Sequence, residues 1–403
     1  MLRTYRAAFR APGSAEFVMA GFIGRFPISV YPISFVLLFS LKTGHYGFGG
    51  LLSGIYVVSN GIGTPALGRM VDRFGQRRVL LPATLVHLAA VSTIVALVKS
   101  GAPDWSLIAP TIVLGLAFLP VGSLVRARWS MVLAGQPELT TAYALESALD
   151  EVIFTVGPLL ASVIATQIDA VWAFVLAGVL VLVGAAWLFG QRDTEPPGQE
   201  VGATPHESAL RSRGMLLLIF ATMGMGAVFA TAEVTIVAFC NEHGSKGLIG
   251  PVIACFAGGS ALSGFLYGAR LHASPVRDRF RRQALILGAL PALFLAAVNV
   301  GTLALIAAVV GTAIAPTLIS AFGLVEKVVP NAALNEGMSW LITGLSFGYG
   351  IASSVVGRIA DAATTRWAFS VGIAAGVGVC ILAVLAHSRV EARAESEPVT
   401  VRA

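Results

Sequence analysis

Ionisable side chains inside otherwise apolar runs are the residues of this sequence best suited to chemistry. Glu233 lies in the apolar run 214–240 without a basic residue within one helical turn, and Arg25 lies in the run 16–40. A charged group at the centre of a spanning helix costs at least about 2.5 kcal/mol, so such a group is usually functional. A desolvated carboxyl such as Glu233 is suited to reversible protonation, although a hydrogen-bonded structural carboxyl is the alternative.

A second group of charges lies where two consecutive apolar runs meet. Glu146 and Asp150 are four residues apart and share one helical face, and Glu151 follows them. Arg126 and Arg128 lie near the end of the preceding run, and a turn between the runs makes them antiparallel. We therefore expect an ion-pair network at this place. A structural or gating role for these ion pairs is favoured over direct proton transfer or substrate binding, and both interpretations remain open.

The composition places these charges in a membrane. The chain has 403 residues, of which 56% are hydrophobic and 12% charged, whereas a soluble domain carries about 25% charged residues. So much apolar surface must face lipid. The net charge of +6 does not predict nucleic-acid binding, because the basic residues lie in short loops between apolar runs. No phosphate-binding loop, nucleophile elbow, zinc-protease motif or metal-ligand spacing is present, which argues against an enzyme, a metal site or a bound cofactor.

The apolar runs predict an all-α membrane protein. A spanning helix needs about 20 apolar residues. The twelve runs that meet this need are 16–40, 47–68, 79–98, 106–131, 142–166, 170–190, 214–240, 247–269, 283–300, 302–325, 335–359 and 367–387. We expect two pseudo-symmetric six-helix halves around a polar linker with three prolines. The predicted division is 1–190 for the first bundle, 191–213 for the cytoplasmic linker, 214–388 for the second bundle and 389–403 for a cytoplasmic tail.

The basic residues also predict an orientation. With both termini in the cytoplasm, 19 Lys and Arg residues lie on the inner side and five on the outer side, counting Arg358 at the outer end of its run, and the remaining three lie within the runs. Positive loops stay on the cytoplasmic side of a membrane. The sequence therefore predicts a multi-pass protein of the cell membrane with both ends inside, and we expect it to work as a monomer.

Residues 68–80, GRMVDRFGQRRVL, resemble the loop motif of the major facilitator superfamily. The residues that fill the motif are Gly68, Asp72, Arg73, Gly75, Arg77 and Arg78. The motif lies between the second and third runs, and the run count and central linker agree with the same family. The resemblance implies a transporter fold in which this loop acts as a latch for one access state. Simple topology signalling by the basic residues is the alternative.

A second resemblance is partial and concerns Gly157-Pro158 in the fifth run. The proton antiporters of this superfamily carry Gly-Pro there, with a further glycine four residues earlier and a glycine pair shortly after. Here Ile153 occupies the earlier position, and Ala161 and Ser162 replace the pair. The resemblance supports an exporter modestly and leaves the direction of transport open.

Together these features predict a secondary active transporter that moves a small organic solute by alternating access, with proton-coupled efflux favoured. The residues expected to couple protons or line the substrate cavity are Glu233, Arg25, Asp150 and Glu151, with Arg25 as a partner of Glu233 in one state only. Proton-coupled import or facilitated diffusion of a metabolite is the first alternative. A membrane sensor without transport is the second, although the chain has no soluble signalling domain. The expected partners are the solute and the lipid bilayer, without nucleic acid.

Overall fold

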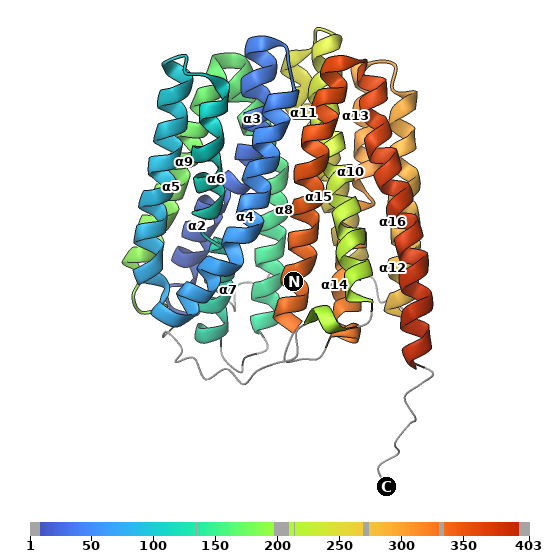
Figure 1. Cartoon of the computed structure of the whole chain (residues 1–403). Helices are drawn as coiled ribbons and strands as arrows, with labels where there is room; N and C mark the ends of the chain where they lie inside the picture. Colours follow the sequence, from blue (N-terminus) through green and yellow to red (C-terminus); the bar gives the residue numbers. More distant parts are fainter. Residues whose placement is uncertain are drawn as a thin grey trace. The chain divides into compact units, whose positions relative to one another are not determined.

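Every regular element in the described part of the computed structural model is a helix, which confirms the predicted all-α class (Figure 1). The structure describes residues 9–133, 136, 138–196, 209–212, 214–268, 274–329 and 334–394. The helices before the predicted linker are α2 (Ser14–Arg25), α3 (Pro27–Thr43), α4 (Gly47–Phe74), α5 (Gln76–Lys99), η1 (Asp104–Leu107), α6 (Ile108–Leu116), α7 (Val121–Val132), α8 (Glu138–Ile164), η2 (Ala165–Asp169) and α9 (Ala170–Gly190). Those that follow are η3 (Ala209–Arg211), α10 (Met215–Glu242), η4 (Lys246–Leu248), α11 (Ile249–Gly268), α12 (Val276–Ala289), η5 (Leu290–Ala296), α13 (Val300–Gly311), α14 (Ile314–Val328), α15 (Leu334–Ala362) and α16 (Thr365–Ala394).

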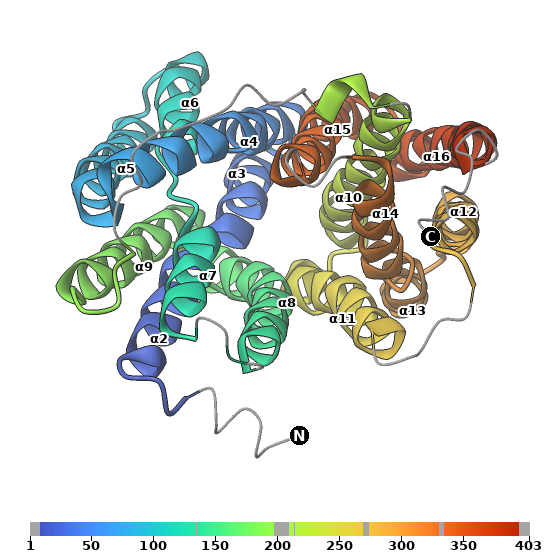
Figure 2. The same cartoon turned by 90° about the horizontal axis from the view of Figure 1, so that it is seen from below.

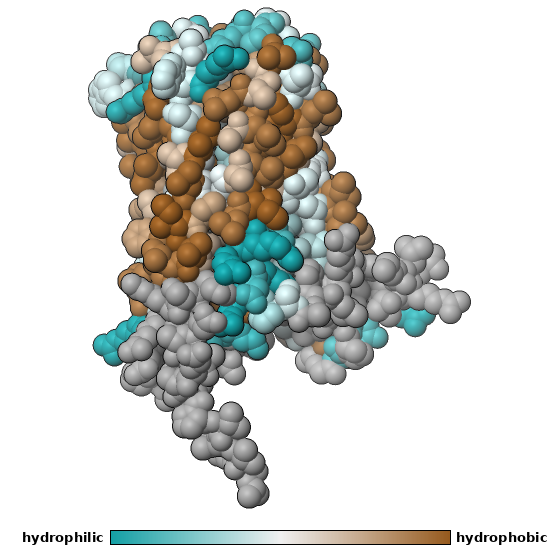
Figure 3. All heavy atoms as spheres, turned by 90° about the vertical axis from the view of Figure 1, so that its right-hand side faces the viewer, coloured by the Kyte–Doolittle hydropathy of each residue, from teal (hydrophilic) through white to brown (hydrophobic). Residues whose placement is uncertain are grey.

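Many of these helices have the length and composition of membrane spans. Within the described residues, nine helical stretches are long and apolar enough to cross a bilayer. One of them, Ala148–Gly190, is 43 residues long and includes most of the predicted run 142–166 and all of 170–190. On the side that carries α12 and α16, apolar residues cover the middle of the face and polar residues gather at its ends (Figure 3). The chain is thus a multi-pass membrane protein, and the count of twelve spans stays a prediction.

The chain forms two compact units. The first contains residues 1–202 together with 245–254, and the second contains 203–244 together with 255–403. The division falls within the predicted linker, but the start of α11 associates with the first unit.

In the first unit, α2 packs against α7, α8 and α9 (Figure 2). Phe17 and Trp129 meet edge to face with ring centroids 4.8 Å apart, and both are completely buried. The helix ends at Arg25, and α3 begins with Pro27, whose missing N–H suits the first position of a helix. This break lies directly beside Arg25 and sets the position of its side chain.

In the second unit, α10 packs closely against α15 through glycines. A Cβ atom on Gly226 of α10 would overlap the carbonyl group of Leu345, and one on Gly348 of α15 would overlap that of Met223. Glycine removes the side chain that would hold two helix backbones apart. The contact brings Tyr349, the neighbour of Gly348, against α10.

Replacing Gly348 by alanine is expected to destabilise the second unit, because the added methyl group has no room against the Met223 carbonyl. Overpacking of this kind costs about 1–3 kcal/mol. Thermal unfolding of the purified protein measures the effect. Gly378→Ala on α16 is the matched control, since nothing lies within 4 Å of its added Cβ. Equal unfolding temperatures for the two variants would contradict the proposed close packing.

Candidate functional site

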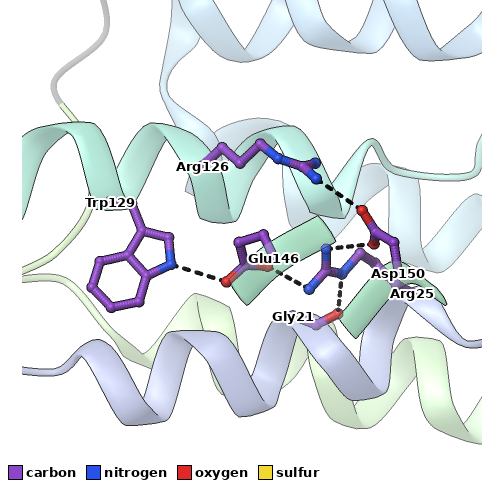
Figure 4. A network of polar contacts seen from close by, with 6 residues as sticks. All are labelled: Gly21, Arg25, Arg126, Trp129, Glu146 and Asp150. Atoms are coloured by element: carbon purple, nitrogen blue, oxygen red, sulfur yellow. Dashed lines mark hydrogen bonds and ion pairs between the residues drawn. The ribbon is translucent and has the colours of Figure 1, made fainter. Parts of the chain in front are cut away.

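Four charged side chains of the first unit form one network (Figure 4). The guanidinium of Arg25 donates to Glu146 Oε2 at 2.5 Å and to Asp150 Oδ1 at 2.7 Å. Arg126 donates to the other oxygen of Asp150 at 2.8 Å. Trp129 Nε1–H donates to Glu146 Oε1 at 2.9 Å, so both oxygens of this carboxylate accept a hydrogen bond. The structure thus brings together side chains from α2, α7 and α8.

The two ends of this network differ in exposure. The side chains of Arg25 and Glu146 are 6% and 0% exposed, whereas those of Arg126 and Asp150 are 35% and 32% exposed. Two positive and two negative charges balance within the group. A buried ion pair is tolerated where the remaining polar atoms are also satisfied, and Arg25 Nε meets this need by donating to the carbonyl of Gly21. The Arg25–Glu146 pair is therefore buried, whereas solvent reaches the Arg126–Asp150 pair.

The Gly157-Pro158 motif holds α8 close to α3. Ser29 Oγ donates to the carbonyl of Ile153 at 2.9 Å, and a Cβ on Gly157 would overlap Ser29 Oγ. Glycine at position 157 therefore lets Ser29 reach the backbone of α8. This contact helps to set the depth at which Glu146 and Asp150 face α2.

Glu233 of α10 has a different environment in the second unit. It is buried, and Tyr349 of α15 donates its hydroxyl to Glu233 Oε2 at 2.7 Å. Among the described residues, no Lys, Arg or His nitrogen lies within ion-pair distance of this carboxyl. Phe229, one helical turn before Glu233, lies with its ring centroid 6.1 Å from that of Tyr349 and 5.4 Å from that of Phe256. Glu233 is thus a buried carboxyl held by a neutral hydroxyl beside aromatic rings.

The family loop motif forms the tight connection between α4 and α5. Gly75 separates the two helices with a φ of +85°, a conformation that glycine adopts without strain. Gly68 lies on α4, and Arg77 and Arg78 lie on the first turn of α5, where the Arg78 side chain is exposed. Asp72 and Arg73 belong to the last turns of α4, and their side chains lie outside the described part of the structure.

Arg128, the other arginine expected in this network, contacts different residues in the described structure, and its gating role stays a prediction. Arg128 lies two residues from Arg126 on α7, and side chains two positions apart on a helix do not share a face. Its guanidinium donates instead to Gln76 Oε1 at 2.8 Å and to Thr194 Oγ1 at 2.9 Å. The side chain of Glu151 is also outside the described part, so its membership in the network stays a prediction.

Sequence reasoning missed Trp129 and Gln76, and it did not identify Tyr349 as the partner of Glu233. Trp129 lies three residues after Arg126, a spacing that places the two side chains on neighbouring faces of α7. This spacing was a usable signal for its contact with Glu146. The contacts of Gln76 and Tyr349 join helices far apart in the sequence, and no local pattern indicates them.

Comparisons with known proteins agree with this fold. A family model described as Major Facilitator Superfamily matches residues 17–290, which is more than half of the chain. A crystal structure of a variant of the nucleoside transporter NupG is similar with a TM-score of 0.71 and 14% identity, over 93% of this chain and 99% of that one. The POT family transporter PepTSo is similar with a TM-score of 0.67 and 11% identity, over 96% of this chain and 99% of that one. A search of curated protein sequences finds no match. The chain therefore belongs to the major facilitator superfamily and is a transporter, not an enzyme.

Proposed function

We propose that this protein exports a small organic solute in exchange for protons, by alternating access and without a bound cofactor. The environment of Glu233 carries the proposal. A carrier of protons must gain a proton from one side and lose it to the other, so its charge must not be neutralised permanently by a cation. Glu233 contacts a neutral tyrosine hydroxyl at 2.7 Å and, in the described residues, no cationic group.

The Arg25 network is better suited to gating than to carrying protons. Both oxygens of Glu146 accept hydrogen bonds, and Asp150 is held by two guanidinium groups. Removing one charge from such a group leaves its partners unpaired in a buried place. Opening the network therefore requires a change of conformation that separates these paired groups together.

Flux across a bilayer tests the proposal. Purified protein is first screened for solutes that raise its thermal unfolding temperature, with ethidium and uridine among the probes. Uridine is included because NupG is described as a nucleoside transporter. Each stabilising solute is then offered to proteoliposomes with an acidic or an alkaline lumen. Uptake driven by an acidic lumen is the result expected of proton antiport.

The same measurement separates the alternatives. Uptake driven by an alkaline lumen would indicate proton symport and so favour an importer. Uptake without any dependence on the gradient would indicate a facilitator. Solutes that bind and stabilise the protein without any flux would favour a sensor and contradict the proposal.

Orientation is tested by labelling cysteines from outside the cell. With Cys240, Cys255 and Cys380 replaced by alanine, Arg192→Cys and Lys246→Cys each supply a single thiol at an exposed position. The charge bias predicts that an impermeant maleimide labels position 246 and not position 192 in intact cells. Disrupted cells provide the control in which both positions react. Labelling of position 192 in intact cells would reverse the proposed topology.

The loop motif is proposed to stabilise one access state. Asp72→Asn removes the negative charge of the motif and keeps the size of the side chain. We expect slower transport with normal membrane insertion and an unchanged unfolding temperature, because the latch contributes to a step of the cycle and not to the fold. Arg69→Gln, an exposed charge beside the motif, is the control. Wild-type rates in Asp72→Asn would leave the loop as a topology signal only.

A further inference from the structure

Arg128 is completely buried near the end of α7, yet it forms no ion pair within the described part of the chain. Its hydrogen bonds go to neutral acceptors, and the nearby Glu195 carboxylate adds an electrostatic attraction without an ion-pair contact. The acceptors are Gln76 Oε1 at 2.8 Å, the Leu188 carbonyl at 3.0 Å, the Gln191 carbonyl at 3.1 Å, Gln191 Oε1 at 3.4 Å and Thr194 Oγ1 at 2.9 Å. An arginine side chain stays charged in proteins. Burying that charge requires every donor to find an acceptor, so the acceptors must remain in place.

Three of these acceptor atoms belong to the segment that follows α9. Gln191 contributes its carbonyl and its side-chain oxygen, and Thr194 contributes a hydroxyl that is 5% exposed. The methyl group of Thr194 packs against Gly13, where an added Cβ would lie 2.8 Å from it. The segment is thus inserted among the helices of the first unit at this point.

The same segment also contacts the family loop motif. Glu195 Oε1 accepts a hydrogen bond from the backbone N–H of Arg77 at 2.9 Å, and the Arg77 guanidinium lies 4.2 Å from the ring centre of Phe189. Gln76, at the start of α5, bonds to α7 in two places. Its Oε1 accepts from Arg128, and its amide N–H donates to the Leu124 carbonyl at 3.1 Å. The α4–α5 connection, α7 and the start of the linker are therefore tied together.

We propose that Arg128 is a positioning residue that fastens residues 191–195 to the loop motif, so that these five residues belong to the first unit and the connection to the second unit starts after Glu195 and not after α9. Release of these five residues would add up to about 17 Å of extended chain to the connection. The length of the tether between the two units would then depend on the state of the loop motif. This inference does not depend on Glu233, on proton coupling or on the direction of transport.

Spin labelling of the segment tests this fastening. The label is attached through Asp193→Cys, at an exposed position, in a chain whose three native cysteines are alanine. Thr194→Val removes one of the five acceptor atoms of Arg128 and keeps the shape of the side chain, whereas Thr194→Ser keeps the hydroxyl. Arg192→Gln is the matched control, because this neighbouring side chain is exposed.

We expect Thr194→Val to shorten the rotational correlation time of the label several-fold while a cooperative thermal unfolding transition is retained, because Arg128 keeps its acceptors on Gln76, Leu188 and Gln191. Thr194→Ser and Arg192→Gln should leave the label as immobile as in the parent protein. Arg128→Met should mobilise the label as well. If Arg128→Met does not fold, the result for Thr194→Val alone tests the inference. A label that stays immobile in Thr194→Val would overturn the inference. A mobile label that appears only with loss of the cooperative unfolding transition would also overturn it, because Arg128 would then act only in the fold.

Discussion

Replacing Glu233 by glutamine is expected to abolish transport driven by a pH gradient while exchange of solute across the membrane remains measurable. Glutamine has the shape of the protonated carboxyl but neither gains nor loses a proton in the working range. Its amide oxygen still accepts the hydrogen bond that Tyr349 now donates to Glu233 at 2.7 Å, so the contact between α10 and α15 is retained. Proteoliposomes measure both quantities, as gradient-driven uptake and as counterflow of labelled solute.

Glu242→Gln is the matched control for this experiment. Glu242 is an exposed carboxyl at the end of the same helix, and its Oε1 accepts the backbone N–H of Thr365 at 3.1 Å. Glutamine preserves this bond, so gradient-driven uptake should stay at the wild-type level. Unchanged gradient-driven uptake in Glu233→Gln would eliminate Glu233 as the carrier. Asp150, whose side chain is 32% exposed, would then be the next candidate.

Removing Arg25 is expected to have the largest effect on stability. Arg25→Met leaves Glu146 completely buried with the indole N–H of Trp129 as its remaining described partner in the network. Breaking a buried pair from one side costs about 3–5 kcal/mol, because it leaves an uncompensated charge. Thermal or denaturant unfolding in detergent measures the loss, and Arg126→Met is the comparison, since its partly exposed pair should contribute less.

A double variant tests how much the Arg25–Glu146 pair as a whole contributes to stability. The double variant Arg25→Met with Glu146→Leu removes both buried charges, and Asp150 keeps Arg126 as a partner at 2.8 Å. Well-packed apolar residues often replace a buried ion pair at little cost. The double variant should therefore be more stable than Arg25→Met alone. Glu146→Leu alone completes the comparison, and additive losses from the two single substitutions would show that the pair is not energetically coupled.

The sequence by itself determined the helical class and the membrane environment. In a bilayer every backbone N–H and C=O must form a hydrogen bond within the protein. A long apolar run meets this need by folding as a helix. The helix α5, for example, covers the predicted run 79–98 and extends it by a few residues at the beginning. The closeness of Arg126 and Asp150 also followed from local order, because consecutive antiparallel helices bring such residues to similar depths.

Only the tertiary structure decided which of the remaining polar groups meet. Glu233 and Tyr349 are 116 residues apart, and their contact depends on the glycine packing of α10 against α15. Arg25 reaches Glu146 across 121 residues because α2 ends beside α8. The rotation of α7 turns Arg128 away from these carboxylates and toward Gln76 and Thr194. Side-chain partners across a helix bundle depend on helix rotation and distance of approach, which arise from the packing of many residues at once and leave no pattern in the local sequence.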